Sequence, residues 1–137
     1  MRRTPLSKKG KGESATLKRK IQDKLRELVI KRDGNCILWK ARHCNDPVLQ
    51  ADHLITRANS ATYADSRLVV CLCRSCHGWK HWHKEQYDDL VKTTVLPKKI
   101  VKLWNDCERD SWKPRRTGSY DWRVALAVLE QEIKQLD

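Results

Sequence analysis

Apolar residues recur at helical spacing near the start of the chain, in a segment whose other positions are mostly charged. Between residues 16 and 33 these apolar side chains are Leu17, Ile21, Leu25, Leu28 and Val29. Positions three and four apart share one face of a helix, so the pattern predicts an amphipathic helix from Thr16. Gly34 follows directly and is predicted to cap the C-terminal end of this helix.

The middle of the chain has shorter apolar runs that predict strands. Residues 48–55 follow a turn and favour one strand, and "SRLVVCLC", residues 66–73, favours a second because it is rich in branched side chains. A helix is expected to open just after Cys76 and to end before Pro97. Strands followed by helices indicate an α+β fold.

Two further helices are predicted towards the C-terminus, at residues 98–109 and from Asp121 onward. The second has an apolar stripe made of Trp122, Leu126, Leu129, Ile133 and Leu136. Residues 1–15, rich in Lys, Gly and Ser, predict a disordered basic arm. We expect residues 16–92 to form the central domain and residues 93–137 a helical extension packed on it.

Four of the six cysteines have a spacing that suits a metal ion. Cys73 and Cys76 form a C-x-x-C pair, which lets two thiolates reach one tetrahedral Zn²⁺. Cys36 and Cys44 lie upstream and are predicted to complete the set, with His43 as the alternative to Cys44. In the reducing cytosol such cysteines bind metal more often than they form disulfides.

The composition explains why a metal staple would be useful. Hydrophobic residues make up 39% of the chain and charged residues 34%, so only a modest core is expected. Cys71 is interpreted as a small buried apolar residue, because on a strand it would lie on the same side as Cys73 with a single residue between them.

The net charge of +12 favours a polyanionic partner, most simply DNA. Arg57 and Arg74 are candidate phosphate contacts, and the basic arm adds Lys8, Lys9 and Lys11. No apolar run approaches the roughly 18 residues needed to span a bilayer, and the basic N-terminal residues lack the apolar stretch of a secretory signal. We therefore expect a cytoplasmic protein without a membrane partner.

A second group of residues suits an open site for a divalent cation. Asp52 and His53 stand together at a predicted strand end, and His77 and His81 are four residues apart, on one face of the predicted helix. A carboxylate with one or two imidazoles can hold such an ion while leaving positions for substrate.

The order of these motifs resembles the HNH endonucleases. "ADHLITR…LVVCLCRSCHGWK" is similar to their Asp-His, loop, C-x-x-C-His pattern, and the resemblance covers residues 32–85. "RRTPLSKK" and "RDGNC" further resemble small phage and prophage HNH nucleases, some of them described as recombination endonucleases. The resemblance implies a zinc-stapled ββα-metal core, here with an N-terminal helix and C-terminal helices.

The resemblance also implies residue roles. Asp52 and His77 would ligate a catalytic Mg²⁺ or Mn²⁺, with Ni²⁺ as an alternative, His81 would join them, and His53 would be the general base. The reaction would be hydrolysis of DNA phosphodiester bonds to 5′-phosphate and 3′-hydroxyl ends, in recombination, repair or processing. A phage-encoded enzyme would act in the cytoplasm of its bacterial host.

The chain departs from the family at one position. The family's Asn, five residues before the first cysteine of the C-x-x-C pair, is replaced by Leu68, and Asn59 lies too early. The absence of this Asn favours an alternative, a zinc-stapled DNA-binding module without catalysis. A phage packaging accessory protein is a further alternative. Monomer and homodimer are both open, because no interface can be identified from the sequence.

Overall fold

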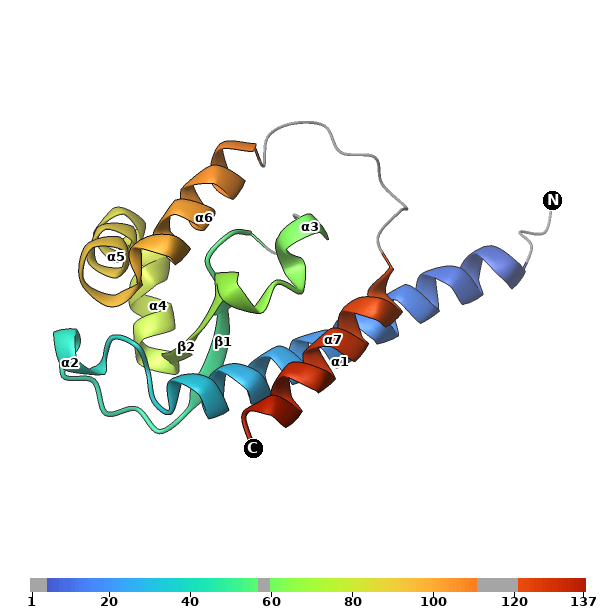
Figure 1. The fold of residues 1–137 in the computed structure, drawn as a ribbon, viewed down its shortest axis with the longest axis horizontal. Coiled ribbons are helices and arrows are strands. Elements are labelled where there is room, and N and C mark those ends of the chain that lie inside the picture. Colours follow the sequence, from blue (N-terminus) through green and yellow to red (C-terminus); the bar gives the residue numbers. More distant parts are fainter. Residues whose placement is uncertain (1–4, 57–59, 111–120) are drawn as a thin grey trace.

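The computed structural model describes residues 5–56, 60–110 and 121–137, and places a small antiparallel hairpin between two groups of helices (Figure 1). The strands are β1 (Leu49–His53) and β2 (Val69–Cys73), with Leu49 opposite Cys73 and His53 opposite Val69. The helices are α1 (Pro5–Asp33), α2 (Trp39–Arg42), α3 (Ser60–Tyr63), α4 (Arg74–Trp82), α5 (Lys84–Leu90), α6 (Lys98–Asp110) and α7 (Trp122–Gln135). A 3₁₀ turn (Ser66–Leu68) precedes β2, and a π-helical turn (Val91–Val95) follows α5. The predicted α+β class is confirmed.

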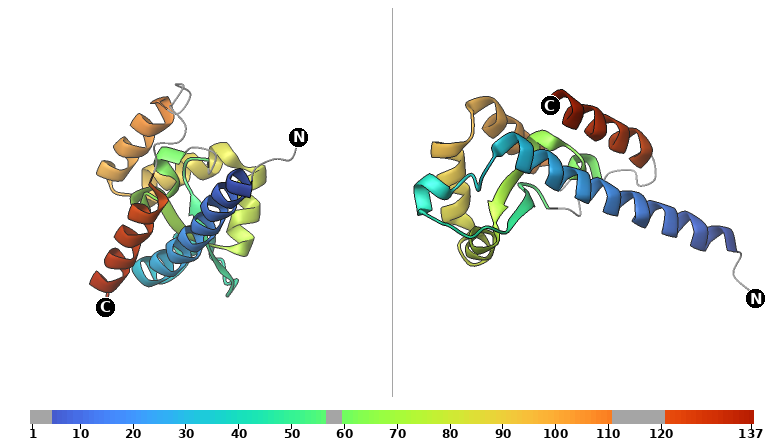
Figure 2. Two further views of the ribbon diagram at one scale, coloured as in Figure 1. Left: turned by 90° about the vertical axis from the view of Figure 1, so that its right-hand side faces the viewer. Right: turned by 90° about the horizontal axis from the view of Figure 1, so that it is seen from below.

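Helices α1 and α7 lie side by side and cover one face of the hairpin (Figures 1 and 2). They run in the same direction, because Lys18 lies over the ring of Trp122 while Lys31 pairs with Asp137 at the other end. The core between them and the hairpin consists of Ile21, Leu25, Leu28, Val29, Ala51, Tyr63, Val69, Cys71, Leu129 and Ile133. Each large apolar side chain buried there contributes about 1.5–3 kcal/mol.

The other face of the hairpin is covered by the helices that follow β2. The core on this side contains Leu38, Leu54, Ile55, Leu68, Val70, Leu72, Tyr87, Val91 and Trp104, together with Cys36, Cys73 and Cys76. Trp104 of α6 is fully buried in it. Because successive side chains of a strand point to opposite faces, β2 contributes to both cores and is buried along its whole length.

The edge of β2 that faces away from β1 is covered by polar groups near the end of α1. Arg32 donates a hydrogen bond to the carbonyl oxygen of Val69 at 2.7 Å, and the Asp33 carboxylate accepts one from the Cys71 N–H at 3.0 Å. The Ile37 N–H donates to the Cys71 carbonyl at 2.9 Å. The Val69 carbonyl and both backbone groups of Cys71 therefore have partners without a third strand.

Helix α1 differs from its prediction at one end. It begins at Pro5, whereas the sequence pattern predicted a start at Thr16 and assigned residues 1–15 to a disordered arm. Lys, Glu and Ala are strong helix formers, so the helix can continue through a segment without an apolar stripe. Its C-terminal end agrees with the prediction: Gly34 has φ of 74°, and its N–H donates to the Ile30 carbonyl at 3.0 Å.

The helix predicted to open after Cys76 begins earlier, at Arg74. Cys73 is the reason, because its Sγ accepts a hydrogen bond from the Cys76 N–H at 3.3 Å and so caps the helix. The segment is also divided at His83, where α4 gives way to α5. Cys71 is fully buried under α1 and is not one of the clustered cysteines, which agrees with its interpretation as a small apolar residue, whereas Cys73, at the end of β2, contacts the core on the other face.

The two C-terminal helices form as predicted. The carboxylate of Asp121 accepts hydrogen bonds from the N–H groups of Arg123 and Val124, at 3.0 and 3.4 Å, and thereby caps α7. Helix α6 contributes Trp104 to the core on one face of the hairpin, and α7 contributes Leu129 and Ile133 to the core on the other face. Within the described residues, none of the helices combines the length and the apolar character that crossing a bilayer requires.

Candidate functional site

Cys36, Cys44, Cys73 and Cys76 come together in one cluster, in which all four sulfur atoms lie within 4.8 Å of one another. A tetrahedral zinc with Zn–S bonds of 2.3 Å holds its sulfurs about 3.8 Å apart. The cluster can therefore hold a metal ion such as zinc after small side-chain movements. Among the described residues it is the only such group of three or more potential ligands.

The four ligands come from three separate parts of the fold. Cys36 follows the Gly34 cap of α1, and its N–H donates to the side-chain oxygen of Asn35 at 2.8 Å. Cys44 follows α2, where His43 has a left-handed φ of 51° and ends the helix. Cys44, rather than the alternative His43, belongs to the cluster. A bound ion would tie the chain after α1 to the junction of β2 and α4.

Burial sets the protonation of these thiols. It raises the pKa of Cys36 to about 11, and it raises the pKa of Cys76 further, with neighbouring thiols adding to the effect. Burial also opposes ionisation of Cys73, but the Cys76 N–H and the surrounding thiols outweigh it and lower the pKa of Cys73. Without an ion the Cys36 and Cys76 thiols are protonated at neutral pH, so metal binding must displace protons.

A cation lies directly beside the cluster. The guanidinium of Arg42, the last residue of α2, donates to the Cys76 sulfur at 3.1 Å and lies 4.3 Å from the centre of the Trp79 ring. A Zn²⁺ ion with four thiolates carries a net charge of −2, and a nearby guanidinium stabilises such a charge.

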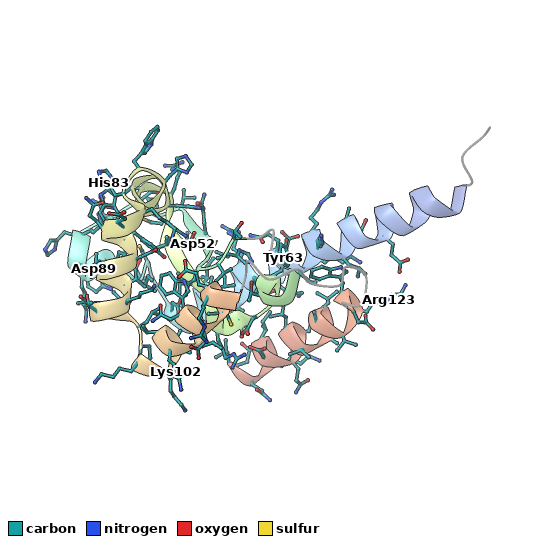
Figure 3. The ribbon with its side chains drawn as sticks, turned by 90° about the horizontal axis from the view of Figure 1, so that it is seen from above. Asp52, Tyr63, His83, Asp89, Lys102 and Arg123 are labelled. Carbon is teal, nitrogen blue, oxygen red and sulfur yellow. The ribbon has the colours of Figure 1, made fainter. Side chains whose placement is uncertain are left out.

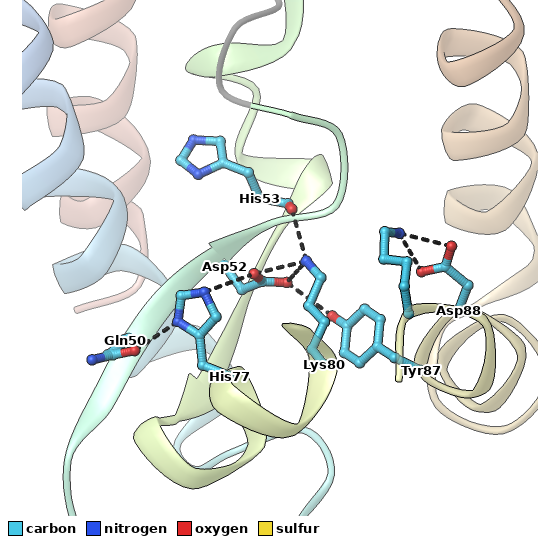
Figure 4. A network of polar contacts seen from close by, with 8 residues as sticks. Gln50, Asp52, His53, His77, Lys80, Tyr87 and Asp88 are labelled. Carbon is cyan, nitrogen blue, oxygen red and sulfur yellow. Dashed lines mark hydrogen bonds and ion pairs between the residues drawn. The ribbon is translucent and has the colours of Figure 1, made fainter. Parts of the chain in front are cut away.

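Asp52, on β1, lies at the centre of a second polar group (Figure 4). Its carboxylate is almost fully buried, and both oxygens accept hydrogen bonds from the Lys80 ammonium, at 2.8 and 2.7 Å. The Tyr87 hydroxyl donates to it at 2.9 Å, and Lys80 also reaches the His53 carbonyl at 3.2 Å. Burial and the Asp52 charge raise the pKa of Tyr87, which keeps it a hydrogen-bond donor. Asp52 is labelled in Figure 3, which shows the side chains of the described residues from above.

His77, on α4, faces the same carboxylate. Its Nδ1 is 2.7 Å from the Gln50 side-chain oxygen, which can only accept, so Nδ1 carries a hydrogen. Its Nε2 points at Asp52 across 3.6 Å. A lone pair on Nε2 next to a carboxylate is unfavourable unless a cation or a proton lies between them. The His77–Asp52 pair can therefore accept a positive ion.

His53 is oriented separately, on the other side of its strand. Its Nε2 lies 2.9 Å from the backbone carbonyl of Tyr63, and its ring is 5.2 Å from the Tyr63 ring. Because a carbonyl only accepts, Nε2 carries the hydrogen, and Nδ1 is the atom able to take a proton. The imidazole points away from Asp52 and His77 in Figure 4.

Asp52, His53 and His77 all line one cleft of about 520 Å³. Its other lining residues include Gln50, which bonds to His77, and two residues of α1. The structure thus places the three sequence-predicted residues around a common space.

The other predicted site residues lie elsewhere. His81 is exposed and contacts the ring of Trp82, and it is not part of the Asp52 group. Arg74 is exposed and pairs with Asp46 at 3.3 Å, away from the cleft. Lys8, Lys9 and Lys11 lie on the first turns of α1. Arg57 and Asn59 lie outside the described residues.

Sequence reasoning missed Lys80 and Tyr87, the two partners of Asp52. Lys80 had a signal, since it lies three residues after His77 and therefore on the same side of the helix. No sequence pattern pointed to Tyr87, because α4 and α5 are separate helices and their relative direction depends on the break at His83.

Comparison with known proteins gives no relationship. No model of a known protein family matches the chain, and neither a curated protein nor a solved structure is significantly similar to it. The function must therefore be argued from the geometry of the two sites.

Proposed function

We propose that the chain is a metal-dependent endonuclease of the HNH type that hydrolyses DNA phosphodiester bonds. The observation that carries this proposal is the placement of Asp52, His77 and His53 around one cleft, although they come from a strand and a following helix. The order of hairpin, cysteine pair and helix supports it, because it matches the ββα arrangement that the resemblance implies. The net charge of +12 suits a DNA substrate.

The residues fit the chemistry of phosphodiester hydrolysis. His53 would take a proton from the attacking water through Nδ1, while the Tyr63 carbonyl holds its ring in place. Asp52 and His77 would hold the divalent cation, which supplies charge for the phosphate and the leaving 3′ oxygen. Two protein ligands are enough for Mg²⁺, which keeps waters and binds substrate phosphate directly.

Lys80 would lie beside any such ion. Its ammonium bonds to both oxygens of Asp52 and the Tyr87 hydroxyl bonds to one of them, so one of the roughly four lone-pair sites of the carboxylate remains for an incoming ion. Lys80 also neutralises the buried carboxylate, which would otherwise be unfavourable in the core.

The loop between the strands supports the proposal despite the missing Asn. Leu68, at that position, is buried, and its carbonyl accepts a hydrogen bond from the Leu54 N–H at 2.9 Å. Tyr63 supplies the backbone carbonyl that orients His53. Backbone groups thus close the loop and position the proposed base in this chain.

We further propose that the four-cysteine cluster holds a structural zinc. The cluster offers four sulfur donors, and a set of four cysteines is typical of structural sites. Three of the four cysteines are buried in the core, so the ion would stabilise the packing of β2 and α4.

Replacing Arg42 with methionine should weaken zinc binding about 10-fold, within the range known for partners that hydrogen-bond to ligands. The methionine keeps much of the apolar stem and removes the charge beside Cys76. Competition with a zinc chelator measures the change. Lys40→Met is the matched control, because Lys40 lies on the same helix, over Trp39 instead. Equal weakening in both variants would contradict a specific role for Arg42.

A second candidate function is a zinc-stapled DNA-binding module without catalysis. One observation favours it: Lys80 and Tyr87 already satisfy the Asp52 carboxylate, so the group is complete without a divalent ion. This module would need the basic surface and the cysteine cluster, but neither His53 nor His77.

Incubation of the purified full chain with supercoiled plasmid tests the proposal. We expect nicked plasmid with Mg²⁺ or Mn²⁺ and none when divalent ions are omitted, because the Asp52–His77 pair alone provides no net positive charge for the phosphate. Linear, nicked, branched and single-stranded DNA, assayed in parallel, then define the preferred substrate. Binding of DNA without cleavage of any of them would favour the non-catalytic module.

A further inference from the structure

Helix α1 forms one wall of the cleft that contains Asp52, His53 and His77. It contributes Gln22 and Arg26, which are four residues apart and therefore share one face of the helix. The sequence pattern predicted only that this segment forms an amphipathic helix with one apolar face. Its polar side nevertheless reaches the candidate active site.

Arg26 is the only lysine or arginine among the described residues that line the cleft. Its Nε donates to the carbonyl of Leu49, on β1, at 3.0 Å, which fixes the plane of the guanidinium. Neither of its two Nη groups has a partner among the described residues. Lys80, another cation near the cleft, forms an ion pair with Asp52.

Gln22 adds a second observation about this wall. Its side-chain oxygen is buried and has no hydrogen-bond donor among the described residues. Buried acceptors are nearly always paired, so this oxygen needs a donor other than the described side chains. The donor would be a water, since a phosphodiester offers acceptors only.

We propose that Arg26 binds the phosphodiester that enters the cleft, through its two Nη groups. This inference rests on the proposed function and adds a substrate-binding residue to it. The planar fork of a guanidinium matches two oxygens of one phosphate, and the Leu49 carbonyl holds the fork in a fixed direction. The phosphate would then lie between α1 and the strand that carries Asp52 and His53.

The test is DNA binding by the full chain, measured without divalent ions over a range of salt concentrations. Arg26→Gln should weaken binding about 10-fold and lower the slope of log K against log[salt] by about 0.9, the value for one lost phosphate contact. Arg26→Lys should keep the slope, because it keeps the charge. It should nevertheless slow cleavage at least 10-fold, because a lysine has no fork.

Lys24→Gln is the matched control, since Lys24 lies on the same helix, pairs with Glu27 and does not line the cleft. It should leave the slope unchanged. An unchanged slope in Arg26→Gln, or an equal fall in Lys24→Gln, would overturn the assignment. If the unaltered chain cleaves no DNA, the proposed function fails, but the salt dependence still decides whether Arg26 contacts a phosphate.

Discussion

Replacing Cys73 with serine is expected to release the zinc and to abolish cooperative unfolding of the domain. Cys73 is both one of the four clustered sulfurs and the cap of α4, and it is buried in the core. A serine hydroxyl is a poor zinc ligand, and the loss of a structural zinc site removes folding free energy directly. Elemental analysis should find about one zinc in the parent chain and none in the variant, and thermal unfolding should lose its sharp transition.

Cys71→Ala is the control for this experiment. Cys71 is fully buried on the same strand, but it packs under α1 and is not part of the cluster. The substitution should keep the zinc and lower the free energy of unfolding by only about 1 kcal/mol, because it removes a single atom from the core. A zinc-free Cys73→Ser protein with a normal melting transition would rule out a structural role for the ion.

Replacing His77 with alanine should lower the cleavage rate by about 100-fold or more, while zinc content and melting temperature change little. His77 directly follows the zinc-cluster residue Cys76, but its imidazole turns to Asp52 and Gln50 instead. His53→Ala should slow cleavage by about 10²–10⁴-fold, the usual contribution of a general base. The two variants should differ in Mn²⁺ binding, measured by calorimetry, which only His77→Ala should weaken.

The control for both histidine variants is His83→Ala. His83 is exposed, stacks on Trp79 at 5.3 Å and does not line the cleft. It should leave cleavage, zinc content and Mn²⁺ binding unchanged. Loss of zinc in His77→Ala would show instead that His77 belongs to the cysteine cluster, and unimpaired cleavage in His77→Ala would contradict its assignment to the active site.

The helices and strands could be predicted wherever the periodicity was strong. The stripe from Leu17 to Val29, the Gly34 cap and the Asp121 helix start all depend on local spacing and on one capping residue. The start of α4 could not be predicted, because the cap is the sulfur of Cys73, which is not a usual N-cap residue. The extent of α1 was also missed, since helix propensity without an apolar stripe is a weak signal.

The candidate site, too, could be predicted only where local spacing carries the information. Spacing predicted the four cysteines, which do cluster, and it also predicted Asp52, His53 and His77, which line one cleft. It could not identify Arg26, which reaches the cleft only because α1 packs across the hairpin. His81 shows the opposite case: helical spacing put it on the face of His77, but in the last turn of α4 it is exposed and contacts the ring of Trp82.

The polar cover on the outer edge of β2 has a consequence for the behaviour of the protein in concentrated solution. A two-stranded sheet has two open edges, and β2 is an almost wholly apolar strand of the kind that recruits strands from other molecules. Arg32, Asp33 and Ile37 use the backbone groups of Val69 and Cys71 that an intruding strand would need. The end of α1 therefore blocks this edge of β2 from pairing with a strand of another molecule, and it does so only while α1 stays docked on the hairpin.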